Sequence, residues 1–130
     1  MFEQLNDPQR AAVTTCDRPL LVLAGAGSGK TRVITYKIAW LLSKLHVSPK
    51  NIFAVTFTNK AAREMKERVT ELLDQDLTRG LTVSTFHSLG MAILREEVEA
   101  SGRKAGFSIF DPQDSLFVVR ELLKLSLIHI

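Results

Sequence analysis

The residues best suited to chemistry form one glycine-rich loop, Ala24-Gly25-Ala26-Gly27-Ser28-Gly29-Lys30-Thr31. Small residues let such a loop turn several backbone N–H groups inward toward phosphate oxygens. In this pattern Lys30 reaches the β- and γ-phosphates of ATP, and the Thr31 hydroxyl ligates Mg²⁺. The first position is Ala24 rather than the usual Gly, but the tight approach falls on Gly27 and Gly29. The loop therefore predicts a site for nucleotide phosphates and Mg²⁺, with Lys30 and Thr31 as its catalytic residues, and by itself leaves kinases, GTPases, transporters and helicases open.

The segments on either side of the loop separate this interpretation from a glycine-rich turn with a chance Gly-Lys-Thr. Residues 20–23 form a continuous apolar run after Pro19, typical of a strand buried on both faces. Residues 30–45 follow helical spacing, and their predicted buried face comprises Ile34, Ile38, Leu41 and Leu45. A strand before the loop and a helix after it favour the phosphate-binding interpretation.

The rest of the chain continues to alternate strand and helix patterns. Asn6-Asp7-Pro8 is a helix-start signal near the N-terminus. After the loop region we expect a strand at residues 51–57, a helix capped by Thr58 or Asn59, a strand at residues 81–85 and a helix at about residues 88–100. This alternation is typical of a parallel sheet with right-handed crossovers, so the predicted fold class is α/β.

Composition sets broad limits. The 130 residues carry a formal net charge of +3, which mildly favours anionic partners such as nucleic acid. Cys16 is the only cysteine, so no internal disulfide can form, and a reducing compartment suits the chain. The N-terminus has no signal-peptide pattern, and the longest apolar run, residues 20–26, is too short to span a bilayer. We therefore expect a cytoplasmic protein without a structural metal.

Four separated motifs, in order along the chain, carry a family resemblance. They are Leu5-Asn6-Asp7-Pro8-Gln9, the glycine-rich loop with Arg32 after it, Ala54-Val55-Thr56-Phe57-Thr58-Asn59-Lys60-Ala61-Ala62, and Ser84-Thr85-Phe86-His87-Ser88. Together they resemble superfamily 1 DNA helicases of the Rep/UvrD/PcrA group, and residues 80–123 resemble the Rep branch most. The resemblance implies a P-loop NTPase (RecA-like) parallel sheet flanked by helices. It also implies ATP-driven 3′ to 5′ movement on single-stranded DNA, duplex junctions as partners, and duties in DNA replication or repair.

The resemblance also assigns residues to the adenine base. It implies that Gln9 reads the adenine edge, for which an amide is chemically suited because it both donates and accepts hydrogen bonds. It implies that the planar Arg32 guanidinium stacks on the adenine ring. Without the resemblance, Gln9 would be a solvated residue of a first helix turn and Arg32 a solvent-facing helix residue.

Two further segments are expected to contact single-stranded DNA. The resemblance assigns this role to Thr56, Phe57, Thr58, Asn59 and Lys60, and to Thr85, Phe86 and His87. Both segments follow predicted strands, on the side of a parallel sheet where ligands gather. Hydroxyl, amide and ammonium groups suit backbone phosphates, and Phe57 suits stacking on a base. The alternative for Phe57 is a place in the core, since it alternates with Phe53 and Val55.

No buried run here ends in the Asp-Glu pair that ATP hydrolysis needs. Asp111 ends a partial match, but with Pro112 after it we expect it to cap a last helix toward Lys124. The resemblance places the acidic motif farther along the chain. We therefore expect residues 1–124 to be the first part of a UvrD-like helicase ATP-binding domain, itself incomplete. Its motor core would span about residues 1–100, an inserted helical subdomain would begin at about residues 101–124, and residues 125–130 would be a non-native tail.

Two other classes remain open on the sequence. One is a small P-loop kinase that phosphorylates a metabolite, although no lid-like segment with arginines is found. The other is a nucleic-acid-binding module with a vestigial loop, which the intact Lys30 and Thr31 argue against. The helicase interpretation predicts that this chain binds ATP–Mg²⁺ and DNA but requires the remainder of the protein for hydrolysis and unwinding.

Overall fold

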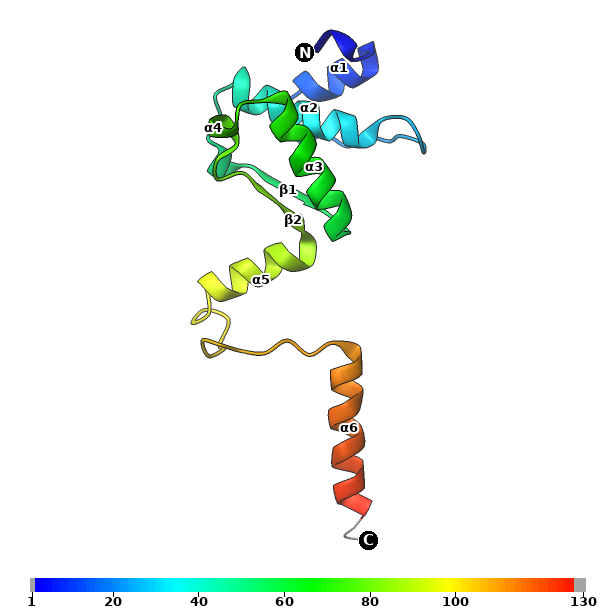
Figure 1. Cartoon of the computed structure of the whole chain (residues 1–130), viewed down its shortest axis with the longest axis vertical. Helices are drawn as coiled ribbons and strands as arrows, with labels where there is room; N and C mark the ends of the chain where they lie inside the picture. Colours follow the sequence, from blue (N-terminus) through cyan, green and yellow to red (C-terminus); the bar gives the residue numbers. More distant parts are fainter. Residues whose placement is uncertain (1, 128–130) are drawn as a thin grey trace. The chain divides into compact units, whose positions relative to one another are not determined.

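The computed structural model of the chain describes residues 2–127. The chain divides into two compact units, one ending at Ala92 and one beginning at Ile93 (Figure 1). The first unit holds every segment that the sequence assigns to ATP or DNA. Each unit is described by itself below.

The N-terminal elements are a short 3₁₀ helix η1 (Phe2–Gln4) and helix α1 (Asp7–Thr14). The predicted start signal is confirmed, because the Asn6 side chain accepts a hydrogen bond from the Gln9 backbone N–H at 2.9 Å. The Gln9 side-chain oxygen in turn accepts from the Asn6 backbone N–H at 3.2 Å. This reciprocal capping box satisfies two N–H groups that a helix start leaves open. It also fixes the Gln9 side chain at the first turn of α1.

Helix α2 (Lys30–Ser43) follows the glycine-rich loop directly, as predicted. The predicted buried face is only partly correct, because Ile34 and Leu45 are exposed. Helix α2 packs against α1 on one side and against a later helix on another, so its buried surface is wider and rotated. The buried residues of α2 are Val33, Thr35, Tyr36, Ile38, Ala39 and Leu42.

Two short parallel strands, β1 (Phe53–Thr56) and β2 (Thr82–Thr85), form the sheet. Between them the chain passes through helix α3 (Asn59–Leu72) and the short helix α4 (Gln75–Thr78), and η2 (Pro49–Asn51) precedes β1. Thr58 caps α3 by accepting from the Ala61 backbone N–H at 3.2 Å, which decides between the two predicted capping residues. In the ladder, Phe53 pairs with Thr82 and Thr56 with Thr85, so both strands end at the same edge.

The predicted strand at residues 20–23 is wrong for this structure. The segment has no strand conformation, and the side chains of Leu21 and Leu23 are 82% and 87% exposed. A strand needs a neighbour for its backbone hydrogen bonds, and β1 and β2 pair only with each other in the part of the chain that is described. The segment keeps its apolar composition without the sheet that would bury it.

Two apolar clusters hold the first unit together. One lies between α2, α3 and β1 and comprises Ile38, Leu42, Ile52, Ala54, Met65 and Val69. The other joins η1, α1 and α2 and comprises Leu5, Ala12, Val13, Val33 and Tyr36. Burial of these side chains is the main source of stability. The second cluster sets α1 against the first turns of α2, beside the glycine-rich loop.

Helix α5 (Phe86–Glu96) begins directly after β2, two residues earlier than predicted, and ends before the predicted residue 100. The second unit contains α6 (Pro112–Leu127). As predicted, Asp111 caps it, because its Oδ1 accepts from the backbone N–H groups of Gln113 at 2.7 Å and Asp114 at 2.8 Å. Helix α6 includes the first three residues of the predicted tail, and residues 128–130 lie outside the described part. None of the helices described within residues 2–127 is long and apolar enough to cross a membrane.

Candidate nucleotide and nucleic-acid sites

The glycine-rich loop turns sharply at two glycines. Gly27 has φ +74° and Gly29 has φ +84°, both in the left-handed region that favours glycine. Gly29 is also the residue before the first turn of α2. These are the two positions where the sequence predicts a tight approach of the backbone.

The N-terminus of α2 is open. Gly29 has no side chain to cap it, and no acidic residue lies in the first turn. A helix start leaves its first backbone N–H groups without partners inside the helix, here including those of Lys30, Thr31 and Arg32. The helix dipole adds partial positive charge at the same point. This geometry suits an anion such as a phosphate group.

The Lys30 side chain folds back over the loop. Its Nζ donates to the Gly25 carbonyl oxygen at 2.7 Å and to the Ala24 carbonyl oxygen at 3.2 Å. The Ser28 hydroxyl donates to the same Gly25 oxygen at 2.7 Å. The ammonium group therefore lies at the mouth of the loop on weak neutral acceptors, which a phosphate oxygen can replace with a charge-assisted contact. Thr31, the next residue, is exposed.

Gln9 lies beside the loop, although it is 19 residues before Ser28. Its Nε2 donates to the Ser28 carbonyl oxygen at 3.1 Å. A Cβ built on Gly29 would lie 3.0 Å from the same nitrogen, so a larger residue at Gly29 would disturb this contact. Both ends of the Gln9 amide are thus engaged, one in the α1 capping box and one on the loop.

A hollow of about 350 Å³ opens between α1 and the loop. Its size is that of a small-molecule site. The lining includes Pro8, Gln9, Ala24, Gly25, Ser28 and Lys30. The structure therefore brings the predicted Gln9 and the predicted phosphate loop to one hollow.

Arg32 lies on α2 outside this hollow. Its Nη2 donates to the Gln4 side-chain oxygen at 2.9 Å, and its guanidinium carbon lies 5.5 Å from the centre of the Tyr36 ring. Gln4 is a residue that sequence reasoning missed. It is separated from Arg32 by 28 positions and belongs to no recognisable motif, so only the packing of η1 on α2 reveals the contact.

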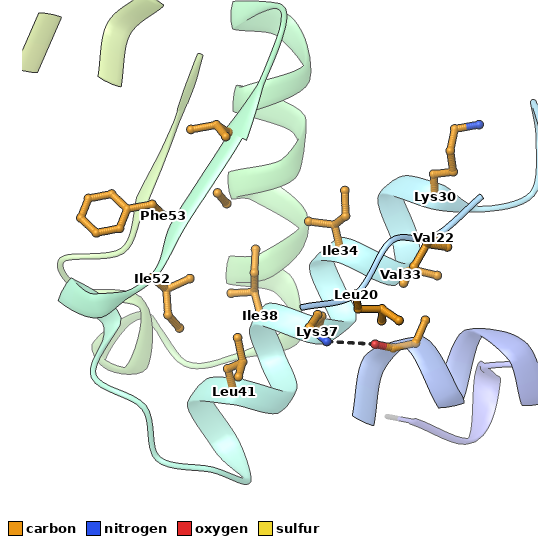
Figure 2. Close-up of a pocket in the computed structure, with 13 residues that line it drawn as sticks. Leu20, Val22, Lys30, Val33, Ile34, Lys37, Ile38, Leu41, Ile52 and Phe53 are labelled. Carbon is orange, nitrogen blue, oxygen red and sulfur yellow. Dashed lines mark hydrogen bonds between the residues drawn. The ribbon is translucent and has the colours of Figure 1, made fainter. Parts of the chain in front are cut away.

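A second, larger hollow of about 440 Å³ is mainly apolar (Figure 2). Figure 2 shows Leu20 and Val22 on one side, Ile34 and Ile38 from α2, and Ile52 beside β1. Apart from Lys30 and Lys37 the lining is apolar, so the hollow does not suit a triphosphate. It lies between the predicted strand at residues 20–23 and β1.

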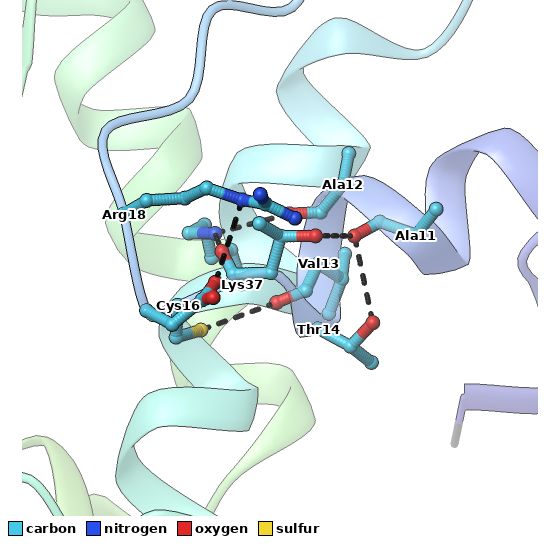
Figure 3. A network of polar contacts seen from close by, with 9 residues as sticks. Ala11, Ala12, Val13, Thr14, Cys16, Arg18 and Lys37 are labelled. Carbon is cyan, nitrogen blue, oxygen red and sulfur yellow. Dashed lines mark hydrogen bonds and ion pairs between the residues drawn. The ribbon is translucent and has the colours of Figure 1, made fainter.

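Lys37 ties the end of α1 to α2 (Figure 3). Its Nζ donates to the carbonyl oxygens of Ala12 at 3.0 Å and Thr15 at 2.5 Å. Carbonyl groups at a helix C-terminus lack partners within the helix, and a cation there also matches the helix dipole. Together with the contact of Gln9 on the loop, this contact holds α1 in place at both of its ends.

The carboxyl ends of β1 and β2 bring the two predicted DNA segments together. Thr56 and Thr85 are partners in the ladder, so the residues that follow each strand start side by side. The rings of Phe57 and Phe86 lie 5.4 Å apart, centre to centre, at an angle of 44°. Phe57 is 87% exposed and Phe86 52% exposed. Phe57 is therefore outside the core of the described chain, in contrast to the alternative interpretation.

The polar side chains at these strand ends differ in exposure and in whether they already form hydrogen bonds. The Thr58 hydroxyl caps α3. Thr85 is buried, and its hydroxyl exchanges hydrogen bonds with Ser88, donating to the hydroxyl at 2.9 Å and accepting from the backbone at 3.1 Å. Lys60 is exposed and lies 3.9 Å from Glu64, and Asn59 and His87 are also exposed. The exposed side chains are thus the ones available to a ligand.

Comparison with known proteins gives one consistent result. Residues 5–129 match the family model of the UvrD/REP helicase N-terminal domain. The ATP-dependent DNA helicase Rep of Escherichia coli (strain K12) is 56% identical over 119 residues, which are 92% of this chain and 18% of that protein. The ATP-dependent DNA helicase PcrA of Bacillus subtilis (strain 168) is 52% identical over 124 residues, 95% of this chain and 17% of that protein. The chain therefore spans less than a fifth of the length of these relatives.

Proposed function

This chain belongs to the UvrD/REP helicase N-terminal domain family, and from that premise we propose that it is the nucleotide-binding first part of an ATP-dependent DNA helicase. The whole protein hydrolyses ATP to move 3′ to 5′ along single-stranded DNA and to separate the duplex at junctions. In this proposal the chain itself binds ATP–Mg²⁺ and contacts single-stranded DNA, whereas hydrolysis and unwinding require the remainder of the protein.

One observation carries the proposal. The open start of α2 and the Lys30 ammonium face the same short loop, and the ammonium is held there by hydrogen bonds to carbonyl oxygens that a phosphate can replace. A triphosphate would accept from the backbone N–H groups of the loop and the first turn of α2. Its oxygens would replace the carbonyl oxygens of Ala24 and Gly25 as acceptors for Lys30, because a charged acceptor forms the stronger hydrogen bond.

The residues around the loop fit the other parts of ATP–Mg²⁺. The Thr31 hydroxyl is exposed next to Lys30 and is an oxygen ligand of the kind Mg²⁺ prefers. When bound, Mg²⁺ neutralises charge that develops on the phosphates during transfer. Gln9 is assigned to the adenine edge, and to donate there its Nε2 must leave the Ser28 carbonyl. Arg32 is assigned to the face of the base.

At the strand ends we assign Phe57 and Phe86 to stacking with DNA bases, since exposed aromatic rings bind single strands in this way. Asn59, Lys60 and His87 are assigned to backbone phosphates. We assign two roles to Thr56, Thr58 and Thr85. They stabilise the backbone at this edge of the sheet, and their hydroxyls contact DNA. Coupling between the two sites would run through α2, α3 and β1, which share one core.

For the whole protein we propose the P-loop NTPase (RecA-like) fold, of which this chain supplies an incomplete part. In that fold residues 20–23 become a strand, and the apolar hollow of Figure 2 is filled by the rest of the sheet. The motor core would cover about residues 1–100 and an inserted helical subdomain would begin at about residues 101–124, with residues 125–130 as a non-native tail.

The test is a chimaera in which the matched part of this chain replaces the matched 124 residues of the B. subtilis relative. The proposal predicts ATP hydrolysis that single-stranded DNA stimulates strongly, and loss of that hydrolysis in the Lys30→Ala chimaera. Hydrolysis that a metabolite stimulates, and DNA does not, would support a kinase instead. DNA binding without any ATP dependence would support a vestigial loop. The unmodified relative is the reference for folding and activity.

A further inference from the structure

We propose that Gln4 is a positioning residue for base recognition, because it holds the Arg32 guanidinium in the orientation in which its free face can stack on a nucleobase. The inference rests on the proposed function, in which Arg32 lies against the base of ATP. Gln4 itself touches neither the base nor the phosphates in this account.

The contact geometry is specific. The Gln4 side-chain oxygen accepts from Arg32 Nη2 at 2.9 Å and from the Tyr36 hydroxyl at 3.1 Å. A carbonyl oxygen has two lone pairs, so both are used. The guanidinium carbon lies over the Tyr36 ring at 5.5 Å, within the range of a cation–π contact. One acceptor oxygen and one aromatic ring therefore contact the same guanidinium.

Gln4 is itself held by apolar packing on both sides. Phe2, at the start of η1, packs edge-on against the rings of Tyr36 at 6.0 Å and Trp40 at 5.1 Å. Leu5, directly after Gln4, is buried in the cluster that joins η1, α1 and α2. Tyr36 is buried in the same cluster. The acceptor oxygen is thus carried on a short backbone segment that is anchored to the helix bearing Arg32.

A preset guanidinium matters for binding a flat ring. A long arginine side chain on a helix surface has many rotamers, and binding must select one of them at an entropic cost. Because Gln4 and Tyr36 already contact the guanidinium, that selection is made before the ligand arrives. In this inference the base stacks on the guanidinium plane, because a planar guanidinium stacks well on an aromatic ring.

The neutral amide also keeps the charge of Arg32 available. A carboxylate at this place would pair with the guanidinium as an ion pair, whereas the amide oxygen only accepts a hydrogen bond. Without a carboxylate beside it, the Arg32 charge stays unpaired and is available to the face of an aromatic base. The effect of Gln4 is expected on ligands that carry a base, because the phosphates are bound by the loop and by Lys30.

The experiment measures binding of two ligands, Mg²⁺–ATP and Mg²⁺–tripolyphosphate, to the 130-residue chain. Tripolyphosphate has the phosphates without the base. Gln4→Leu, which removes the acceptor at similar size, should weaken ATP binding by about 3- to 10-fold and leave tripolyphosphate binding unchanged. Gln4→Glu, which keeps an acceptor oxygen, should recover part of the lost ATP affinity. Gln75→Leu, an exposed glutamine at the start of α4, is the matched control.

The outcomes separate this inference from the proposed function. If the wild-type chain binds ATP and Gln4→Leu binds both ligands as the wild type does, Gln4 has no positioning role and the proposed function still stands. Equal weakening for both ligands would also overturn the inference, since it shows a general effect on the loop or the fold. Circular dichroism and the thermal midpoint identify the latter case. If the wild-type chain binds neither ligand, the proposed function fails together with the inference.

Discussion

The glycine-rich loop and the carboxyl ends of β1 and β2 are both assigned to anionic ligands, yet they are built in opposite ways. In the loop, polar groups turn toward one another, as Lys30 does on Ala24 and Gly25 and Gln9 does on Ser28. At the strand ends the backbone is fixed by a ladder, and two aromatic side chains point outward. The polar groups of the loop are thus hydrogen-bonded to one another, whereas the strand ends expose two aromatic rings on a fixed backbone.

The difference shows what kind of ligand each region suits. A closed loop can exchange weak internal hydrogen bonds for strong ones to a small, highly charged group. An exposed pair of rings gains most from flat, apolar surfaces such as bases, with phosphates held only at the rim. If this distinction is correct, substitutions in one region should change one ligand's affinity and spare the other.

The largest effect is expected from Lys30→Ala. The substitution removes a cation that would donate to two phosphate oxygens, and charge-assisted hydrogen bonds are worth about 1.5–3 kcal/mol each. We expect ATP affinity of the chain to fall at least about 100-fold, with single-stranded DNA affinity changed far less. Equilibrium dialysis with labelled ATP measures the first quantity. Lys44, an exposed lysine just after the same helix, is the control position. If Lys44→Ala lowers ATP affinity equally, the loss comes from the change in net charge and not from a specific contact of Lys30.

Phe57→Ala should produce the next largest effect, and it should lower DNA affinity instead of ATP affinity. Stacking of a base on an aromatic ring contributes about 1–3 kcal/mol, so single-stranded DNA affinity should fall about 5- to 150-fold. ATP affinity should stay the same, because Phe57 lies at the other region. Fluorescence anisotropy of a labelled oligonucleotide measures the loss. Phe53→Ala removes an exposed ring at the start of the same strand, and a similar loss of DNA binding there would speak against a specific stacking site.

Two glycines of the loop offer a finer comparison. Gly29 has φ +84°, and an added Cβ would lie 3.0 Å from Gln9 Nε2. Left-handed backbone costs a residue with a Cβ about 1–2 kcal/mol, so Gly29→Ala should lower ATP affinity by about 5- to 30-fold. Gly25→Ala meets no atom within 4 Å and has no positive φ. Its effect, measured in the same dialysis assay, should be smaller; the reverse order would contradict the loop geometry.

The smallest effect sharpens the account of the strand ends. Thr58 caps α3, and loss of such a cap costs about 1 kcal/mol of folding free energy. Thr58→Ala should therefore lower the free energy of unfolding by about 1 kcal/mol in urea denaturation. DNA affinity under native conditions should fall less than for Phe57→Ala. A large loss of DNA binding with unchanged stability would indicate that Thr58 contacts DNA directly and is not mainly a helix cap.

Local signals made part of the fold predictable. The capping box of Asn6 and Gln9 and the cap by Asp111 depend on residues three or fewer positions apart, so the sequence contains all their partners. The meeting of the residues after Thr56 and Thr85 was also predictable, because parallel strands end at the same edge.

Other features depend on partners far along the chain. Residues 20–23 have the composition of a buried strand, but a strand forms only where a neighbour supplies hydrogen bonds, and β1 and β2 do not do so. The exposed Ile34 on α2 shows the same dependence, because periodicity alone does not say which helices cover a face. The contact of Gln4 with Arg32 depends on the packing of η1 on α2, and no sequence motif predicts that packing.

The central claim is that the loop and the first turn of α2 hold the phosphates of ATP. The most direct measurement is a titration of the ¹⁵N-labelled chain with Mg²⁺–ATP, followed by two-dimensional NMR. Phosphate binding at the loop should give the largest amide shifts at Gly27, Gly29, Lys30 and Thr31, with saturation and with loss of these shifts in Lys30→Ala. Saturable shifts centred on another part of the chain, with those four amides unmoved, would contradict it.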